Sequence, residues 1–196
     1  MRIEFHETRW YFRLGLAIVL VLALPEFAAD DAGKVFLLIS AYFLGAWLYK
    51  VYKRYFFSKA VVFDFHGVMA KGDLSLNDFT DMPGMRELVR RLRGSYKVAL
   101  LTNLNPELYK FYAPRFGFAT LFDFVFYSGK IREVKGPKPD IFNFVMRKIN
   151  VRPENMIFID DREDYLVGAK AAGIRTIHFK SPEQVVSELR KMGISI

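Results

Sequence analysis

The feature that most limits how this chain can fold is a set of short apolar runs that each end in polar residues. Asp64, Thr102 and the pair Asp160-Asp161 all follow directly on such a run. A strand buried in a parallel sheet reads as a continuous apolar run, and open α/β folds carry their chemistry where the strands end. The pattern therefore predicts a parallel sheet with an acid, a hydroxyl group and an acid pair along one edge.

The expected strands alternate along the chain with segments of helical periodicity. Strands are predicted over Ala60–Phe65, Lys97–Leu101, Asp123–Tyr127, Met156–Asp160 and Arg175–Phe179. Helices are predicted over Pro83–Arg93, Ile141–Ile149, Asp164–Ala172 and between Ser181 and Gly193. This alternation is typical of βα units, so residues 57–196 are expected to form an α/β domain, a Rossmann-like parallel sheet of about five strands with helices on both faces.

The amino-terminal part of the chain has a different character. The apolar residues that raise the hydrophobic fraction of the 196-residue chain to 52% are concentrated in the runs Leu14–Leu24 and Val35–Leu48. Aromatic residues, which prefer the membrane interface, extend both runs toward the length of about 20 residues that spans a bilayer. We therefore interpret residues 1–56 as a transmembrane helical hairpin, with spans over about 11–28 and 34–54.

Lysine and arginine residues predict the orientation of this hairpin. They flank its two outer ends, whereas the connector holds only Lys34. The positive-inside rule then places both termini and the α/β domain in the cytoplasm, as parts of a multi-pass membrane protein. Two other interpretations remain open: the first run as a cleaved signal peptide, and both runs as buried helices of a soluble protein.

Cysteine content and charge narrow the possible functions. The chain has no cysteine, which excludes disulfides, thiol catalysis and cysteine–metal sites. Its formal net charge of +8 suits an anionic membrane surface or a nucleic acid. The sequence contains no helix-turn-helix, zinc-finger or RNA-binding signature, so we expect a membrane and no nucleic acid as a partner.

The polar residues at the ends of the runs suit phosphoryl transfer. A carboxylate such as that of Asp64 can attack phosphorus and form an aspartyl-phosphate. Acidic residues can hold Mg²⁺, which takes oxygen ligands and orients phosphate, and a hydroxyl such as that of Thr102 can hold phosphate oxygens together with a lysine. The reaction also needs a general acid that protonates the leaving group and then activates water.

Four segments, in this order, resemble the motifs of the haloacid dehalogenase-like (HAD) superfamily of phosphohydrolases. They are Phe63–Val68, Leu100–Asn103, Lys138–Phe142 in a shortened form, and Phe158–Ile174. The resemblance covers most of the expected α/β domain. It implies a Mg²⁺-dependent phosphatase that forms a covalent intermediate on an aspartate.

The resemblance also implies a metal site. Asp64 is expected to be both the nucleophile and a Mg²⁺ ligand, and the backbone carbonyl of His66 is expected to be a second ligand. Asp161 is the main acidic ligand, with Asp160 beside it. Taken alone, the Asp160-Asp161 pair also suits a strand-to-helix turn in which a carboxylate caps the helix.

The same resemblance implies a phosphate-binding set. Thr102 and Lys138 are expected to bind the phosphate and to take part in catalysis, and Asn103 is expected to lie beside it as a further substrate-binding residue. Because the third motif is shortened, Lys135 remains an alternative to Lys138 for the role of the lysine.

His66 departs from the family pattern, because phosphatases of the family usually carry Asp at this position as general acid and base. Imidazole titrates near neutrality and can do this work. It is bulkier, however, and a cation there disfavours an adjacent Mg²⁺ ion. Three interpretations follow: an active acid/base, a slow enzyme, or a catalytically silent HAD-like adaptor or subunit tethered to the membrane.

The short spacing between the motifs predicts a member of the family without an inserted cap domain. An open site suits a phosphate on a large or membrane-associated partner, because no lid encloses a small metabolite. By family analogy this partner is a protein or a lipid headgroup, and a small ester remains an open alternative. The linker Tyr55–Lys59 is short, and Asp64 lies roughly 20 Å farther along an extended strand. The catalytic edge is therefore expected to face away from the bilayer, toward a soluble ester or a membrane protein partner.

Overall fold

The computed structural model describes residues 39–48, 59–73 and 78–196. The chain divides into two units, Met1–Arg54 and Tyr55–Ile196. In the first unit, residues 39–48 are helical, and the rings of Tyr42 and Phe43 are exposed. No helix within the described ranges is long and apolar enough to cross a membrane. The predicted span 11–28 and the greater part of 34–54 lie outside the described residues.

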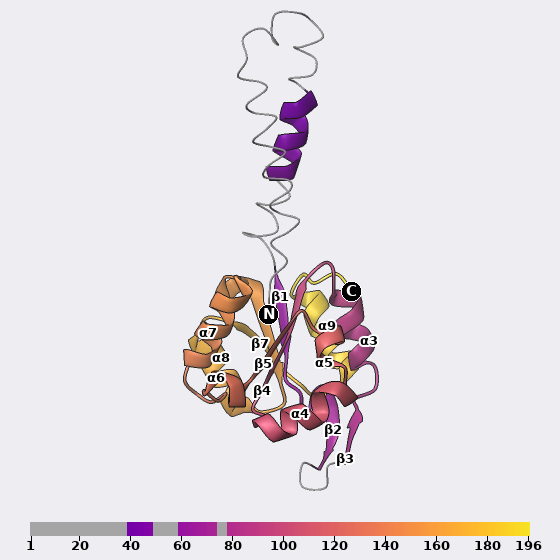
Figure 1. Cartoon of the computed structure of the whole chain (residues 1–196), viewed down its shortest axis with the longest axis vertical. Helices are drawn as coiled ribbons and strands as arrows, with labels where there is room; N and C mark the ends of the chain where they lie inside the picture. The colour runs from indigo at the N-terminus through magenta and orange to yellow at the C-terminus, as the bar shows by residue number, and fades with distance from the viewer. Residues whose placement is uncertain (1–38, 49–58, 74–77) are drawn as a thin grey trace, which may run out of the picture. The chain divides into compact units, whose positions relative to one another are not determined.

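The second unit contains a five-stranded sheet in the order β5-β4-β1-β6-β7, and all neighbouring strands are parallel (Figure 1). The strands are β1 (Ala60–Phe63), β4 (Lys97–Thr102), β5 (Phe124–Tyr127), β6 (Met156–Asp160) and β7 (Arg175–His178). This confirms the predicted α/β fold and its five strands. Because β1 lies in the centre and pairs with both β4 and β6, the residues that follow these three strands meet at one edge.

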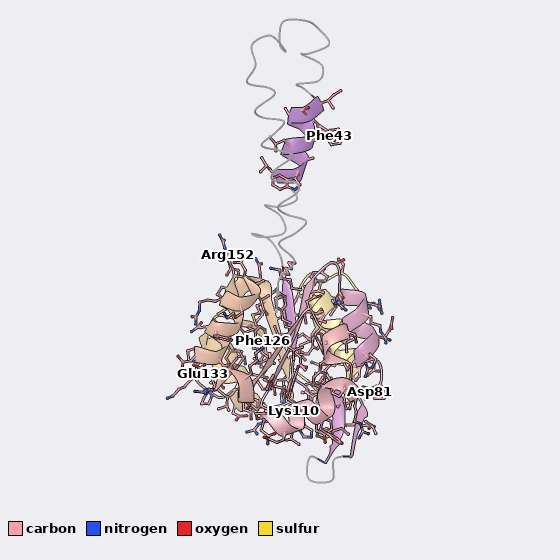
Figure 2. All side chains as sticks on the ribbon, viewed as in Figure 1. Phe43, Asp81, Lys110, Phe126, Glu133 and Arg152 are labelled. Atoms are coloured by element: carbon pink, nitrogen blue, oxygen red, sulfur yellow. The ribbon has the colours of Figure 1, made fainter. Side chains whose placement is uncertain are left out.

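Helices cover both faces of the sheet, as predicted (Figure 1). On one face lie α3 (Met85–Leu92), α5 (Phe118–Leu121) and α9 (Pro182–Lys191), and on the other lie α6 (Ser128–Ile131), α7 (Asp140–Ile149) and α8 (Glu163–Ala171). Each face of the sheet has its own hydrophobic core, and alternate side chains of β1 pack into the two cores. Val61 and Phe63 belong to the core on the first face, and Ala60 and Val62 belong to the core on the second. Figure 2 shows Phe126 inside the domain, whereas Arg152 lies at its surface.

Local sequence signals explain where the predicted helices begin. The hydroxyl of Ser181 accepts a hydrogen bond from the backbone N–H of Gln184 at 3.2 Å, and Pro182 occupies the first helical position of α9. The helix α4 (Pro106–Arg115), which the sequence analysis did not predict, starts in the same way, with the Asn105 side chain accepting from the N–H of Leu108 at 2.8 Å. A short 3₁₀ helix, η3 (Pro153–Asn155), precedes β6.

A two-stranded antiparallel hairpin follows the loop after β1 and was not predicted. It consists of β2 (Ala70–Asp73) and β3 (Asp78–Asp81). Its Phe79 ring packs edge to face against Phe65, with 5.6 Å between the ring centroids. Among the described residues, β2 and β3 are the secondary-structure elements between β1 and α3. They lie next to the carboxyl edge of the sheet, where Asp64 follows β1 (Figure 1).

Candidate active site

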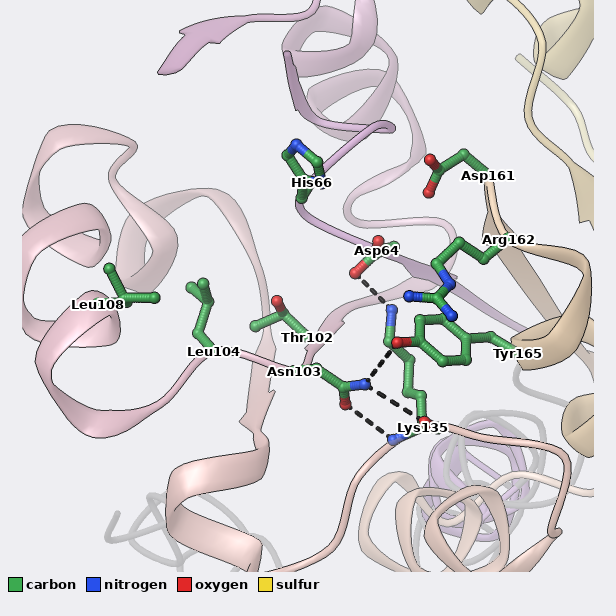
Figure 3. Close-up of a pocket in the computed structure, with 10 residues that line it drawn as sticks. All are labelled: Asp64, His66, Thr102, Asn103, Leu104, Leu108, Lys135, Asp161, Arg162 and Tyr165. Carbon is green, nitrogen blue, oxygen red and sulfur yellow. Dashed lines mark hydrogen bonds and ion pairs between the residues drawn. The ribbon is translucent and has the colours of Figure 1, made fainter. Parts of the chain in front are cut away.

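The carboxyl edge of the sheet carries a pocket to which the predicted residues converge. Asp64 follows β1, Thr102 ends β4 and Asp160 ends β6, and their exposed fractions are 5%, 3% and 0%. The backbone N–H of Asp64 donates to the carbonyl of Ile159 at 3.0 Å, which continues the ladder between β1 and β6. The pocket is lined by Asp64, His66, Thr102, Asn103, Leu104, Leu108, Lys135, Asp161, Arg162 and Tyr165 (Figure 3).

Three carboxylates form a cluster suited to a divalent cation. Asp64, Asp160 and Asp161 each bring one oxygen to within 4.8 Å of the others. Gly67 lies directly beside Asp161: its φ of 86° favours glycine, and a Cβ atom on it would overlap the Asp161 carboxylate. Oxygen ligands of this kind are those that Mg²⁺ prefers, so the donor set fits the predicted metal.

Lys135 balances the charge of this cluster. Its Nζ lies 2.5 Å from Oδ1 of Asp64 and 2.6 Å from Oδ2 of Asp160, and the residue is only 3% exposed. The Nζ also lies 4.8 Å from the centroid of the Tyr165 ring and 5.5 Å from that of Phe158. Lys135 is thus a buried cation held by two carboxylates and two aromatic faces.

The placement of Lys138 at this site is corrected by the structure. Lys138 is exposed and does not line the pocket, whereas Lys135 contacts Asp64 directly. The third motif was matched to Lys138–Phe142 because these residues lead into a helix, α7. The course of the irregular segment before α7 determines instead which lysine reaches the sheet. Gly168 of α8 lies against this segment, next to the carbonyl oxygens of Gly136 and Lys138. The alternative that had been left open, Lys135, is the one that the geometry supports.

Asn103 holds Lys135 in place through its backbone. Its Oδ1 accepts from the N–H of Lys135 at 2.8 Å, and its Nδ2 donates to the carbonyl of the same residue at 3.3 Å. The Nδ2 also donates to the Tyr165 hydroxyl at 3.1 Å. Asn103 therefore connects the end of β4 to the segment that carries Lys135 and to α8 (Figure 3). It lines the pocket, and it also holds Lys135 in position.

The buried charges perturb one another strongly. Burial raises the pKa of Asp64, against the attraction of Lys135. Burial, together with repulsion from Asp64, raises the pKa of Asp160 to about 7. For Lys135, burial disfavours the cation, but Asp64 and Asp160 more than offset this effect and raise its pKa. The cluster therefore retains a cationic lysine, and near neutrality the Asp160 carboxyl group is partly protonated.

His66 lies between the pocket and the β2–β3 hairpin. Its Nε2 is 3.1 Å from the carbonyl oxygen of Gly72 in β2, and because a carbonyl only accepts, Nε2 carries the hydrogen in this contact. The imidazole ring packs against Phe79 with 5.0 Å between the ring centroids. His66 lines the pocket with Asp64, as predicted, and Nδ1 is the ring nitrogen left to exchange a proton with a substrate.

Four pocket residues were missed by the sequence analysis: Leu104 and Leu108, and the pair Arg162 and Tyr165. Arg162 and Tyr165 belong to the turn and the first part of α8, inside the segment that had been matched to the fourth motif. That match assigned roles to the two aspartates alone. The spacing of Arg162 and Tyr165 at i and i+3 across the helix start, which places them on one side, was the available signal.

Comparison with known proteins supports the assignment to a family. The profile of the haloacid dehalogenase-like hydrolase family matches residues 71–173. The glyceraldehyde 3-phosphate phosphatase of Pyrococcus furiosus is 31% identical over 116 residues, which are 58% of this chain and 48% of that protein. The phosphoglycolate phosphatase of Pseudomonas putida is 30% identical over 125 residues, 56% of this chain and 45% of that protein. The chain thus spans about half the length of these curated relatives.

Solved structures share the fold at lower identity. A HAD-like family hydrolase of Porphyromonas gingivalis superposes with a TM-score of 0.60 and 18% identity, covering 71% of this chain and 99% of that chain. A HAD family enzyme of Bacteroides thetaiotaomicron, in complex with magnesium and inorganic phosphate, superposes with a TM-score of 0.55 and 20% identity, covering 63% of this chain and 95% of that chain. With the matched profile, the fold and the site, the chain belongs to the haloacid dehalogenase-like hydrolase family.

Proposed function

We propose that this protein is a Mg²⁺-dependent phosphohydrolase that transfers the phosphoryl group of its substrate to Asp64 and then to water. The observation that carries the proposal is the position of the Asp64 carboxylate: it is buried at the sheet edge, 2.5 Å from Lys135 and clustered with Asp160 and Asp161. A carboxylate in this setting can act as a nucleophile toward phosphorus, and the Lys135 ammonium offsets part of the effect of burial, which raises the pKa of Asp64.

The residues divide the work of the reaction. Asp64, Asp160 and Asp161 would hold the Mg²⁺ ion, which would supply positive charge against the phosphate and orient it. The Lys135 ammonium and the Thr102 hydroxyl stabilise the phosphoryl oxygens as negative charge builds on them. His66 protonates the leaving oxygen from Nδ1, while its Nε2 stays bonded to Gly72, and later accepts a proton from the attacking water.

A second candidate is a catalytically silent HAD-like subunit. It is favoured by the bond between Nε2 of His66 and Gly72, because this bond uses one of the two ring nitrogens to hold the β2–β3 hairpin. In that case the imidazole is a structural link between the loop after β1 and the hairpin, and the pocket binds phosphate without turnover.

We further propose that residues 1–56 anchor the protein in a membrane as a hairpin, with the α/β domain in the cytoplasm. The sequence supports this with two apolar runs and basic residues outside them. Asp64 lies at the far end of β1 from Ala60, the end at which the amino-terminal segment joins the domain. This arrangement, and the names of the relatives, favour a small phosphate ester or a phosphate on a cytoplasmic partner over an embedded lipid.

The test is Mg²⁺-dependent hydrolysis of an aryl phosphate by the full chain in detergent, with Asp64→Asn and His66→Asp alongside. The proposal expects turnover in the wild type and its loss in the folded Asp64→Asn protein. Silence in the wild type with turnover in His66→Asp would support the silent subunit. Equal turnover in the wild type and in Asp64→Asn would show that Asp64 is not the nucleophile.

A further inference from the structure

Arg162 holds a fixed position at the mouth of the pocket. Its backbone N–H donates to Oδ1 of Asp160 at 3.0 Å, which ties it to the carboxylate cluster. Its guanidinium is bound by Asp164 through two hydrogen bonds, Nε to Oδ1 at 3.0 Å and Nη2 to Oδ2 at 2.8 Å. Its Cζ lies 4.3 Å from the centroid of the Tyr165 ring. Asp164 therefore binds one edge of the guanidinium, and the Tyr165 ring contacts one of its faces.

This arrangement creates a second cationic position close to the first. Lys135 and Arg162 both lie within 5 Å of the centre of the Tyr165 ring, at 4.8 Å and 4.3 Å. A guanidinium has five N–H groups, and the bonds to Asp164 occupy two of them, so the Nη1 edge retains donors. Figure 3 shows Arg162 on the same side of the pocket as Lys135 and Tyr165.

The opposite wall of the pocket is apolar. Leu104 and Leu108 line it, across from Arg162 and Tyr165 (Figure 3). A ligand with its phosphate at Lys135 would therefore meet an apolar surface on one side and a planar cation on the other. Because both cations lie against the same Tyr165 ring, a ligand that reaches both of them carries its two anionic groups a few bonds apart.

We propose that Arg162 recognises a carboxylate in the leaving part of a small phosphate ester, so that this site prefers esters with a second anionic group over esters whose leaving part is uncharged. The inference rests on the proposed phosphatase activity and specifies its substrate class. A carboxylate matches the planar fork of a guanidinium, which is the reason for choosing it over a hydroxyl or an amine. In this role Arg162 is a specificity-determining residue and Tyr165 and Asp164 position its guanidinium.

The test compares 2-phosphoglycolate with ethyl phosphate, which lacks the carboxylate. In the full chain, Arg162→Met should lower kcat/KM for 2-phosphoglycolate by about 10- to 100-fold, the loss typical of a charged hydrogen bond, and leave ethyl phosphate almost unchanged. Arg152→Met is the matched control, since Arg152 is another exposed arginine paired with an acid two residues away and lies outside the pocket. It should change neither substrate.

Other outcomes would overturn the inference. An equal loss for both esters would mean that Arg162 acts on the transferring phosphoryl group, and no loss would leave it as a surface ion pair with Asp164. If the wild type turns over neither ester, the proposed activity fails, and calorimetric binding of the two esters decides the inference separately. Tighter binding of 2-phosphoglycolate that Arg162→Met abolishes would support it, and equal binding of the two esters would sink it.

Discussion

Lys135 illustrates how one side chain in an irregular segment can decide the chemistry of a site. Its ammonium contacts Asp64 and Asp160 at 2.5 and 2.6 Å, and Asn103 binds its backbone on both sides. A buried charge is tolerated only when it is paired, so these three residues depend on one another. Lys138, three residues later, is exposed and has no part in this arrangement.

We therefore predict that Lys135→Met lowers kcat/KM for an aryl phosphate by about 10²- to 10³-fold, the loss typical of removing one donor to a developing oxyanion. Lys138→Met is the matched control and should stay within about twofold of the wild type, as is usual for an exposed side chain. Steady-state kinetics on folded proteins, checked by circular dichroism, measures this. A larger loss in Lys138→Met would return the role to that residue.

Asp160 is expected to make Mg²⁺ binding at the proposed site sensitive to pH. Its raised pKa of about 7 keeps the carboxyl group protonated in the folded, metal-free protein at lower pH. Since the folded pKa exceeds the ordinary value of 3.8, this group contributes stability below pH 3.8, and the contribution is lost as the pH rises through about 7. Protons and Mg²⁺ compete for the ionised carboxylate, so the metal binds better once the proton has left.

We predict that Mg²⁺ raises the thermal midpoint of unfolding more at about pH 8 than at about pH 6, since binding to the folded state alone stabilises it. Asp160→Asn should remove most of this pH dependence, and Asp161→Asn should reduce the stabilisation at both pH values. Differential scanning fluorimetry with and without the metal measures both effects. An identical Mg²⁺ shift at the two pH values would contradict the role given to Asp160.

At the scale of elements, α8 and the segment before α7 are closely packed. A Cβ atom on Gly168 would overlap the carbonyl oxygens of Gly136 and Lys138 and the Phe142 ring. The close approach brings the segment that carries Lys135 against the helix that carries Tyr165, so the site depends on this contact between two elements.

We predict that Gly168→Ala lowers the free energy of unfolding by about 1–3 kcal/mol, the usual cost of overpacking, and lowers activity because the Lys135 segment is displaced. Gly136→Ala is the control from the same contact, because a Cβ atom on Gly136 meets no heavy atom within 4 Å. It should change stability by no more than about 0.5 kcal/mol. Urea unfolding measures both, and equal effects in the two variants would contradict the packing argument.

The elements also differ in how far the sequence predicted them. The five strands and the helices α3, α7, α8 and α9 were found because apolar periodicity and capping residues mark them locally. The β2–β3 hairpin was missed because Ala70–Asp73 lacks the alternation of a half-buried strand, and its Gly72 has a φ of 141°. The helix α4 was missed because Pro114 and its aromatic residues obscure a single apolar face.

At the scale of the whole molecule, the two edges of the α/β domain, at opposite ends of the strands, differ in charge. The carboxyl edge carries the acidic cluster, whereas α3, α7 and α9 carry basic residues in their last turns, toward the other edge: Arg90, Arg91, Arg147, Lys148, Arg190 and Lys191. Ala60, the first residue of β1, lies at that other edge. Basic charge at this edge is favourable beside an anionic leaflet.

We predict that the full chain sediments with membranes and is released by detergent but not by high salt, because the apolar runs insert while the basic edge adds only a screened attraction. Fractionation of cells that express the full chain, with salt, carbonate and detergent washes, measures this. Release by salt alone would indicate attachment through the basic edge, and recovery in the soluble fraction without treatment would contradict the anchor.

The sequence by itself determined the α/β class, the five strands and the convergence of Asp64, Thr102 and Asp160, because apolar periodicity is local and parallel strands end at a common edge. The tertiary structure decided which lysine meets Asp64 and placed Arg162 and Tyr165 at the pocket. These outcomes depend on contacts between distant residues, such as Asn103 with Lys135 and Lys135 with Asp160. The course of an irregular segment follows from such packing, and no periodic pattern in the chain encodes it.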